Sequence, residues 1–346
     1  MKRRYKELCK RERQRRRDVK LRKYSKHHNL QRKTSLVLQK PLYSIVPPTK
    51  KEVPTTGVIN APIRLSLLSD AQRCVRFFEL IRSQVDAVLY EGRRRVSLNI
   101  KDIQSIDLPA TMVLNALGRE MGGRGVCISG NFPSNKECYD FFVKTGFLND
   151  KVDDKGMRFN KSEVTDYFTL NKGQGKLSVE DTIHICKIVR KACDYLAKED
   201  FYDDVISIIK EIAGNSIEWS ESYRDQWTLG VMFSGDYVTF SILDLGKGIL
   251  DTISRKFMKK VKGLFTNNIA FLNDVFNKQY SSKSQESNRY KGLPSIKKAF
   301  TDGKIQNLCV MTNNVLMCFG DSSKNIQYSK SRKAFGGTLY YWEISK

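Results

Sequence analysis

Apolar segments with the spacing of a helix alternate in this chain with apolar segments of strand length, and this alternation restricts the fold more than any other feature. Residues 64–92 carry apolar side chains at helical spacing, and residues 93–107 contain a short buried-strand pattern. A second helix is predicted over 108–123, a strand over 125–130 and a third helix over 135–149. This order is typical of an α/β sheet with a right-handed crossover, so the fold class is predicted to be α/β.

Positive charge is concentrated at the N-terminus. Residues 1–34 contain 16 Lys or Arg and three acidic residues, in a chain whose net charge is +24. A segment of this composition cannot bury a core, so we expect it to be disordered, or helical only on a partner. The charge favours contact with the phosphates of nucleic acid or the ribosome. The alternative is a solvated tail or a segment that directs the protein to a place in the cell.

Length and composition set the organisation and the compartment. The 346 residues predict two domains and a tail: a basic arm with a Pro-containing linker over 1–60, domains over 61–150 and 175–346, and a linker over 151–174. No apolar stretch reaches the roughly 18 residues of a membrane span, and the first residues lack the apolar segment of a secretory signal. Eight cysteines without a CxxC pair, most of them in apolar runs, predict core thiols in a reducing cytoplasm.

The order of elements around the acidic loop of the first predicted domain resembles that of a known family. The order of strand, acidic loop, helix, strand and helix over 61–150 resembles the STAS-like domains of anti-anti-sigma factors. In that family the loop begins a helix and often carries a regulatory serine. Leu108 stands at the serine position here, so regulation by phosphorylation is not expected. The alternative is a generic small α/β domain.

Acidic and amide side chains line one face of a predicted helix in the second domain. A helix over 178–199 is expected to be capped by Ser178, and a second helix follows over 201–220. On this second helix Glu211, Asn215 and Glu218 stand at i, i+4 and i+7. An amide oxygen suits Mg²⁺ and a carboxylate can order or deprotonate a water. The alternative is a set of solvent-facing or capping side chains, and Glu218 is expected to face solvent.

Three glycine motifs follow in order. Two strands are predicted to meet at Ser234–Asp236, and the second strand continues into Asp244-Leu245-Gly246-Lys247-Gly248, where a carboxylate precedes flexible backbone. Gly292 is predicted to begin a helix whose N-terminus can hold phosphate, after an irregular segment over 251–291 that is expected to be a lid. Gly337-Thr338 opens a last predicted strand.

Taken together, these four motifs resemble those of the GHKL ATPase superfamily, over roughly half of the chain. The resemblance implies a Bergerat-type α/β sandwich that binds ATP and Mg²⁺ between helices and an open sheet. Asn215 would ligate Mg²⁺, and Glu211 would be the general base for attack of water on the γ-phosphate. Asp244 would accept from the adenine amino group with support from Thr338. The remaining implied ligand-binding positions are Gly246, Gly248, Gly292 and Leu293.

Residues at single positions bear on which subclass of the GHKL superfamily the chain resembles. His184 lacks the following acid of a histidine kinase, and the second glycine box has Tyr290 where the family often has another glycine. A STAS-like segment ahead of a GHKL domain resembles switches of bacterial signalling or defence. The expected function is a slow, Mg²⁺-dependent ATPase that acts as a switch for a protein or nucleic-acid partner, with a nucleotide-dependent homodimer as a further hypothesis. The alternatives are an ATP sensor without turnover and a serine kinase acting on a STAS partner.

Overall fold

The computed structural model describes residues 58–92, 95–148, 168–174, 177–219, 226–252, 268–277, 292–328 and 335–346. The chain divides into two units, residues 1–54 and residues 55–346. The basic arm of residues 1–34 lies outside the described residues. Both domains expected from the sequence fall within the second unit, so the division differs from the expected one.

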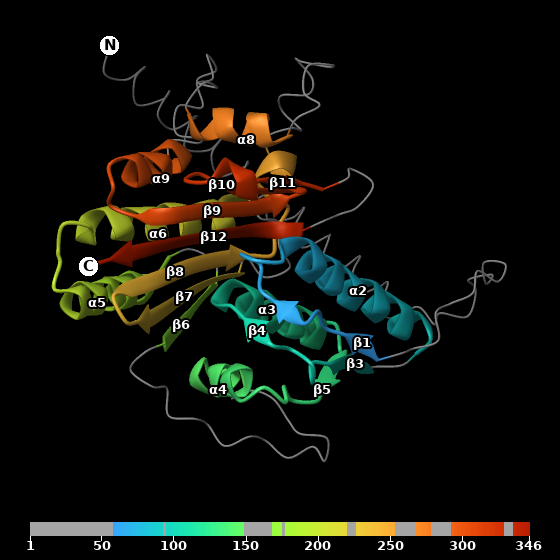
Figure 1. The fold of residues 1–346 in the computed structure, drawn as a ribbon. Helices are drawn as coiled ribbons and strands as arrows, with labels where there is room; N and C mark the ends of the chain where they lie inside the picture. Colours follow the sequence, from blue (N-terminus) through green and yellow to red (C-terminus); the bar gives the residue numbers. More distant parts are fainter. Residues whose placement is uncertain are drawn as a thin grey trace, which may run out of the picture. The chain divides into compact units, whose positions relative to one another are not determined.

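The first part of the second unit is a small α/β layer (Figure 1). Its central strands pair in parallel in the order β1-β3-β5, and β2 pairs with β4 in parallel. The helices predicted over 64–92, 108–123 and 135–149 are confirmed. The bounds are β1 (Ile59–Asn60), β2 (Arg64–Leu65), α2 (Ala71–Tyr90), β3 (Arg95–Asn99), β4 (Ser105–Ile106), α3 (Leu108–Gly123), β5 (Cys127–Gly130) and α4 (Lys136–Lys144).

The start of α3 is fixed by a buried carboxylate. Asp107 Oδ1 accepts from the Ala110 N–H at 2.8 Å and caps the helix, while its Oδ2 accepts from Ser66 Oγ at 2.7 Å and from the Leu68 N–H at 3.0 Å. Leu108 directly follows and is 1% exposed. The position at which the STAS resemblance would place a regulatory serine is therefore a packing position.

The second part contains a seven-stranded antiparallel sheet in the order β11-β10-β9-β12-β8-β7-β6 (Figure 1). The predicted hairpin at Ser234–Asp236 is confirmed, since it joins β7 to β8. Residues 168–174, expected in a linker, instead form edge strand β6 and pair with β7. The bounds are β6 (Phe168–Gln174), β7 (Gln226–Ser234), β8 (Tyr237–Asp244), β9 (Gln306–Asn313), β10 (Val315–Cys318), β11 (Ile326–Gln327) and β12 (Phe335–Ser345).

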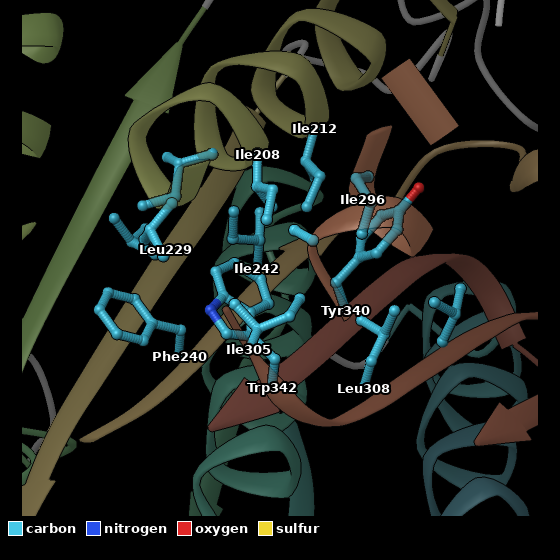
Figure 2. Close-up of a cluster of buried hydrophobic side chains, with 14 of the residues drawn as sticks. Ile208, Ile212, Leu229, Phe240, Ile242, Ile296, Ile305, Leu308, Tyr340 and Trp342 are labelled. Carbon is cyan, nitrogen blue, oxygen red and sulfur yellow. The ribbon is translucent and has the colours of Figure 1, made fainter. Parts of the chain in front are cut away.

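Helices cover one face of this sheet. They are α5 (Val179–Leu196), α6 (Tyr202–Trp219), α8 (Asn268–Phe276) and α9 (Gly292–Thr301). A capping box between Ser178 and Asp181 begins α5, as the sequence predicts for Ser178. Figure 2 shows Ile208 and Ile212 of α6 close to the sheet residues Ile242 and Tyr340. These helices and the side chains on this face of the sheet form one apolar cluster, which we call the main core.

The opposite face of the sheet is covered by the first α/β layer. Leu243, Met311 and Leu339 point away from the main core and join a second core with α2 and α3. The contact is close: a Cβ built on Gly230 of β7 would lie 2.6 Å from Met112 Sδ and 3.2 Å from Leu108 Cδ1. Arg119 of α3 also donates to Thr228 Oγ1 at 2.7 Å. Because strand residues alternate between the two faces, both cores depend on the same strands.

The expected lid over 251–291 contains a helix that belongs to the main core. Four apolar side chains of α8 are buried there, namely Phe271, Leu272, Val275 and Phe276. Asn268 at the start of α8 donates through its N–H to Gln327 Oε1 and through Nδ2 to Asn314 Oδ1, at 2.8 and 2.7 Å. Residues 268–276 are therefore part of the packed domain. The rest of the expected lid, 253–267 and 278–291, lies outside the described residues.

No helix in the described ranges combines the length and the apolarity needed to cross a bilayer. Cys309 and Cys318 face each other on β9 and β10 and form a disulfide, whereas the sequence predicts thiols throughout. Cys127, also predicted to be a core thiol, is exposed. Cys127, Cys309 and Cys318 therefore differ from the expectation that cysteines in apolar runs are core thiols.

We expect Leu108→Ser to lower the free energy of unfolding by about 2–5 kcal/mol, because it removes apolar contacts at a position with no room for water. Urea denaturation would measure this. The control is Leu80→Ser on α2, where Leu80 is 46% exposed, and its effect should stay within about 0.5 kcal/mol. Equal, small effects of both substitutions would contradict the packing role of Leu108.

Candidate functional site

Asp244 is the last residue of β8, and its carboxylate is held by its own turn and by a neighbouring strand. Oδ1 accepts from the Gly246 N–H at 2.8 Å. Thr338 of β12 pairs with Asp244 and donates to its carboxylate through both its N–H and its hydroxyl. The register turns Asp244 and Thr338 toward the main core, one residue away from Leu243, which points the opposite way. The predicted pairing of Asp244 with Thr338 is therefore present in the structure.

Burial dominates the protonation of Asp244. The side chain belongs to a residue that is 7% exposed, and desolvation raises its pKa from 3.8 to about 6 despite the donors around it. Those hydrogen bonds, from Gly246, Ser216 and Thr338, act in the opposite direction and keep the pKa from rising further. Asp244 is thus poised to be ionised at neutral pH while remaining almost free of contact with bulk water.

Glu211 and Asn215 lie one turn apart on α6 and contact each other. Asn215 Nδ2 donates to Glu211 Oε1 at 3.3 Å. This bond uses the amide N–H of Asn215. The amide oxygen of Asn215, which is the atom that a hard cation prefers, takes no part in it. Ser216 follows and connects α6 to β8, because its Oγ lies 3.3 Å from Asp244 Oδ2. The same hydroxyl lies 2.9 Å from the Ile212 carbonyl, so its single hydrogen is shared between that carbonyl and Asp244 Oδ2.

Gly292 begins α9, as predicted, and lies against Glu211. A Cβ built on Gly292 would fall 1.7 Å from Glu211 Cγ and 1.9 Å from Glu211 Oε1. The absence of a side chain at Gly292 therefore brings the N-terminus of α9 next to the carboxylate of Glu211. Leu293, the next residue, is 3% exposed and packs in the main core.

The turn after β8 depends on Gly248. Its φ of +78° lies in the left-handed region, and a Cβ there would fall 2.4 Å from Asn313 Oδ1. Gly248 therefore lets the chain turn sharply beside Asp244. The structure brings Glu211, Asn215 and Gly292 together on one side of the site, with Asp244, Gly246, Gly248 and Thr338 on the other, and Ser216 joins the two groups.

Thr312 and Asn313 of β9 also contact this turn, and the sequence analysis did not single them out. Thr312 Oγ1 accepts from the Ile249 N–H at 2.8 Å and Asn313 Oδ1 accepts from the Leu250 N–H at 3.0 Å. The sequence contains a signal that locates them, because two asparagines between two short apolar runs are typical of a hairpin turn. That signal predicts the hairpin but does not predict its contact with the turn after β8, which lies more than sixty residues earlier in the chain.

Some predicted features fall outside this description. The side chain of Glu218, Tyr290 and the basic arm are not among the described residues. Within the described part of the chain, no group of three or more His, Cys, Asp or Glu side chains is placed to hold a metal ion. A metal at this site would therefore take Asn215 as its protein ligand and complete its coordination from a bound ligand and water.

No protein-family model matches this chain, and no curated protein sequence matches it either.

We expect ionisation of Asp244 to cost stability. A carboxyl whose pKa is raised from 3.8 to about 6 stabilises the fold fully only well below pH 4, and this contribution is lost as the pH rises through 6. Relative to Asp244→Asn, the free energy of unfolding of the wild type should fall by about 2 kcal/mol between pH 4 and pH 7, measured by urea denaturation. The variant is the reference because burial also raises the pKa of Asp107, which remains in both proteins. Parallel pH curves for the two proteins would contradict the assignment.

We expect Gly292→Ala to be destabilising only while Glu211 is present. The new methyl group would overlap Glu211 and lower the free energy of unfolding by about 1–3 kcal/mol. In a Glu211→Ala background the same substitution should cost less than about 0.5 kcal/mol, because the overlapping atoms are gone. A double-mutant cycle by chemical denaturation measures this coupling, and additive effects would show that the two residues do not touch.

Proposed function

We propose that residues 168–346 form a GHKL-type domain that binds ATP with Mg²⁺, and that the chain is a slow ATPase acting as a nucleotide-controlled switch. The observation that carries the proposal is the environment of Asp244. A buried carboxylate at a strand end accepts from its own turn and from Thr338, and it is joined through Ser216 to the helix that carries Glu211 and Asn215. The resemblance in the sequence requires these residues to meet, and strands and helices far apart in the chain bring them together.

The chain's own residues suggest the division of roles. The Asp244 carboxylate would take a hydrogen bond from the exocyclic amine of adenine. The backbone at Gly246 and Gly248 allows close approach of the flat base. The N-terminus of α9 at Gly292 would bind phosphate oxygens, where helix N–H groups favour negative charge. Glu211, which lies against that N-terminus, would orient or deprotonate the attacking water.

A cation would contribute on the phosphate side. The amide oxygen of Asn215 would be its protein ligand, and Mg²⁺ would neutralise the charge that develops on the phosphates. Glu211 accepts from Asn215 Nδ2, so Glu211 holds the amide while its second carboxylate oxygen is left for water. No further protein ligand is required, since Mg²⁺ commonly keeps several waters and substrate phosphates.

The finer parts of the proposal rest on the sequence. The first α/β layer as a STAS-like element, the partner, the homodimer and the cytoplasmic location are proposals. A serine kinase acting within this chain is disfavoured, because the corresponding position is the buried Leu108. An ATP sensor without turnover is favoured by Tyr290 and remains the second candidate.

Titration with Mg-ATP, together with phosphate release, tests the proposal. We expect Asp244→Asn to weaken ATP binding by at least about tenfold, because a charged acceptor is lost. Glu211→Gln should bind within about twofold of wild type and lower phosphate release by about 100-fold or more. The matched control is Asp236→Asn at the other end of β8, whose side chain is 86% exposed and which should change neither quantity.

Each outcome decides between the candidates. Binding with phosphate release that depends on Glu211 supports the ATPase. Binding without release in the wild type favours the sensor. An absence of binding, or ATP binding that is indifferent to Asp244→Asn, would overturn the GHKL assignment and the role of every residue above.

A further inference from the structure

The hairpin turn between β9 and β10 holds the turn that follows Asp244. Thr312 Oγ1 accepts from the Ile249 N–H at 2.8 Å, and Asn313 Oδ1 accepts from the Leu250 N–H at 3.0 Å. Asn313 Nδ2 donates back to the Lys247 carbonyl at 2.8 Å. Three long-range hydrogen bonds thus fix the backbone immediately around Gly248.

These bonds replace a missing helix cap. Helical backbone begins at Ile249, and its first N–H groups have no partner within the helix. The preceding residue, Gly248, has no side chain to cap them, and its left-handed φ excludes the usual capping residues. Thr312 and Asn313 supply the missing acceptors from another strand. The glycine that makes the turn sharp therefore also makes it dependent on the hairpin.

Thr312 reaches the other side of Asp244 as well. Its hydroxyl lies 3.4 Å from Thr338 Oγ1 and 3.2 Å from the Gly337 carbonyl, and the residue is 0% exposed. The strand registers pair Asp244 with Thr338 and Thr338 with Thr312. One buried row across three strands thus contains the carboxylate, the threonine that donates to it and the threonine that anchors its turn.

We propose that Thr312 and Asn313 are positioning residues of the nucleotide site, which hold the Asp244–Gly248 turn in the conformation that base recognition uses. This inference rests on the proposed function and deepens it. Neither side chain needs to touch the ligand, because both act on backbone on the base side of the site. Their loss weakens the binding of ADP and ATP by the same factor, since the phosphates contact the other side at Gly292.

The experiment measures the affinities for ADP and ATP of four variants of the full chain, together with their melting temperatures. Thr312→Val keeps the shape of the side chain and removes its hydroxyl, whereas Thr312→Ser keeps the hydroxyl and removes the methyl group. Asn313→Gly removes the amide and tolerates the φ of +52° at this position, where alanine would add strain. The matched control is Asn314→Ala in the same turn, which loses side-chain bonds to Asn268 and Tyr328 instead.

We expect Thr312→Val and Asn313→Gly to weaken ADP and ATP binding by about tenfold each, with an unchanged ratio between the two nucleotides. Thr312→Ser should bind within about twofold of wild type. Asn314→Ala should lower the melting temperature as much as Asn313→Gly does and leave both affinities within about twofold.

A purely structural role gives a different pattern. If Asn314→Ala weakened binding as much as Asn313→Gly, or if Thr312→Val bound like wild type, the positioning role would be overturned while ATP binding stood. A change in the ratio of ADP to ATP affinity would assign these residues to the phosphate side and also overturn it. If the wild type bound neither nucleotide, the proposed function would fail and this inference would fail with it.

Discussion

The pairing of β8 with β12 places Asp244 opposite Thr338, and most of the candidate site depends on this register. The register is fixed by burial on both faces of the sheet. Ile242 and Tyr340 point into the main core, while Leu243 and Leu339 point into the second core. A slip by one residue would exchange the two sets and turn the Asp244 carboxylate toward α3. Because each face is apolar and covered, such a slip would expose or misplace a row of side chains on both sides at once.

Burial of Asp244 opposes the stability that this register provides. Desolvation raises its pKa to about 6, so the ionised carboxylate is present at neutral pH only because the fold supplies donors from Gly246 and Thr338. A buried carboxylate that costs stability is typical of a binding or catalytic site, where stability is given up for a specific chemical group. The main core, with its close-packed aliphatic and aromatic side chains, offsets this cost.

The elements with local signals could be predicted from the sequence, and the contacts between them could not. The capping box at Ser178, the Gly235-Asp236 hairpin and the glycine that begins α9 lie within a few residues of the structure they specify. The strand β6 pairs with β7, which lies more than fifty residues further along the chain, so its pairing has no local signal. The packing of Leu108 on Gly230 and the anchoring of Ile249 by Thr312 are long-range contacts that no periodicity encodes. The candidate site residues were selected because their order resembles that of a known superfamily, and this resemblance does not point to the residues that support them.

Coverage of both sheet faces bears on how a nucleotide-controlled switch would act in this chain. Neighbouring residues of β12 belong to different cores, so a shift of Tyr340 on the helix side also moves Leu339 on the α3 side. There is a shorter connection at the beginning of the strand: Arg82 of α2 donates to the Gly336 carbonyl at 3.4 Å, two residues before Thr338, and also pairs with Glu120 of α3 at 3.6 Å. Packed cores respond to such displacements by rearranging and not by gradual deformation. If the proposed function is correct, a ligand that shifts Asp244 and Thr338 would therefore alter the packing of α2 and α3 against the sheet. The first α/β layer would then be the part of the chain that transmits the nucleotide state to a partner.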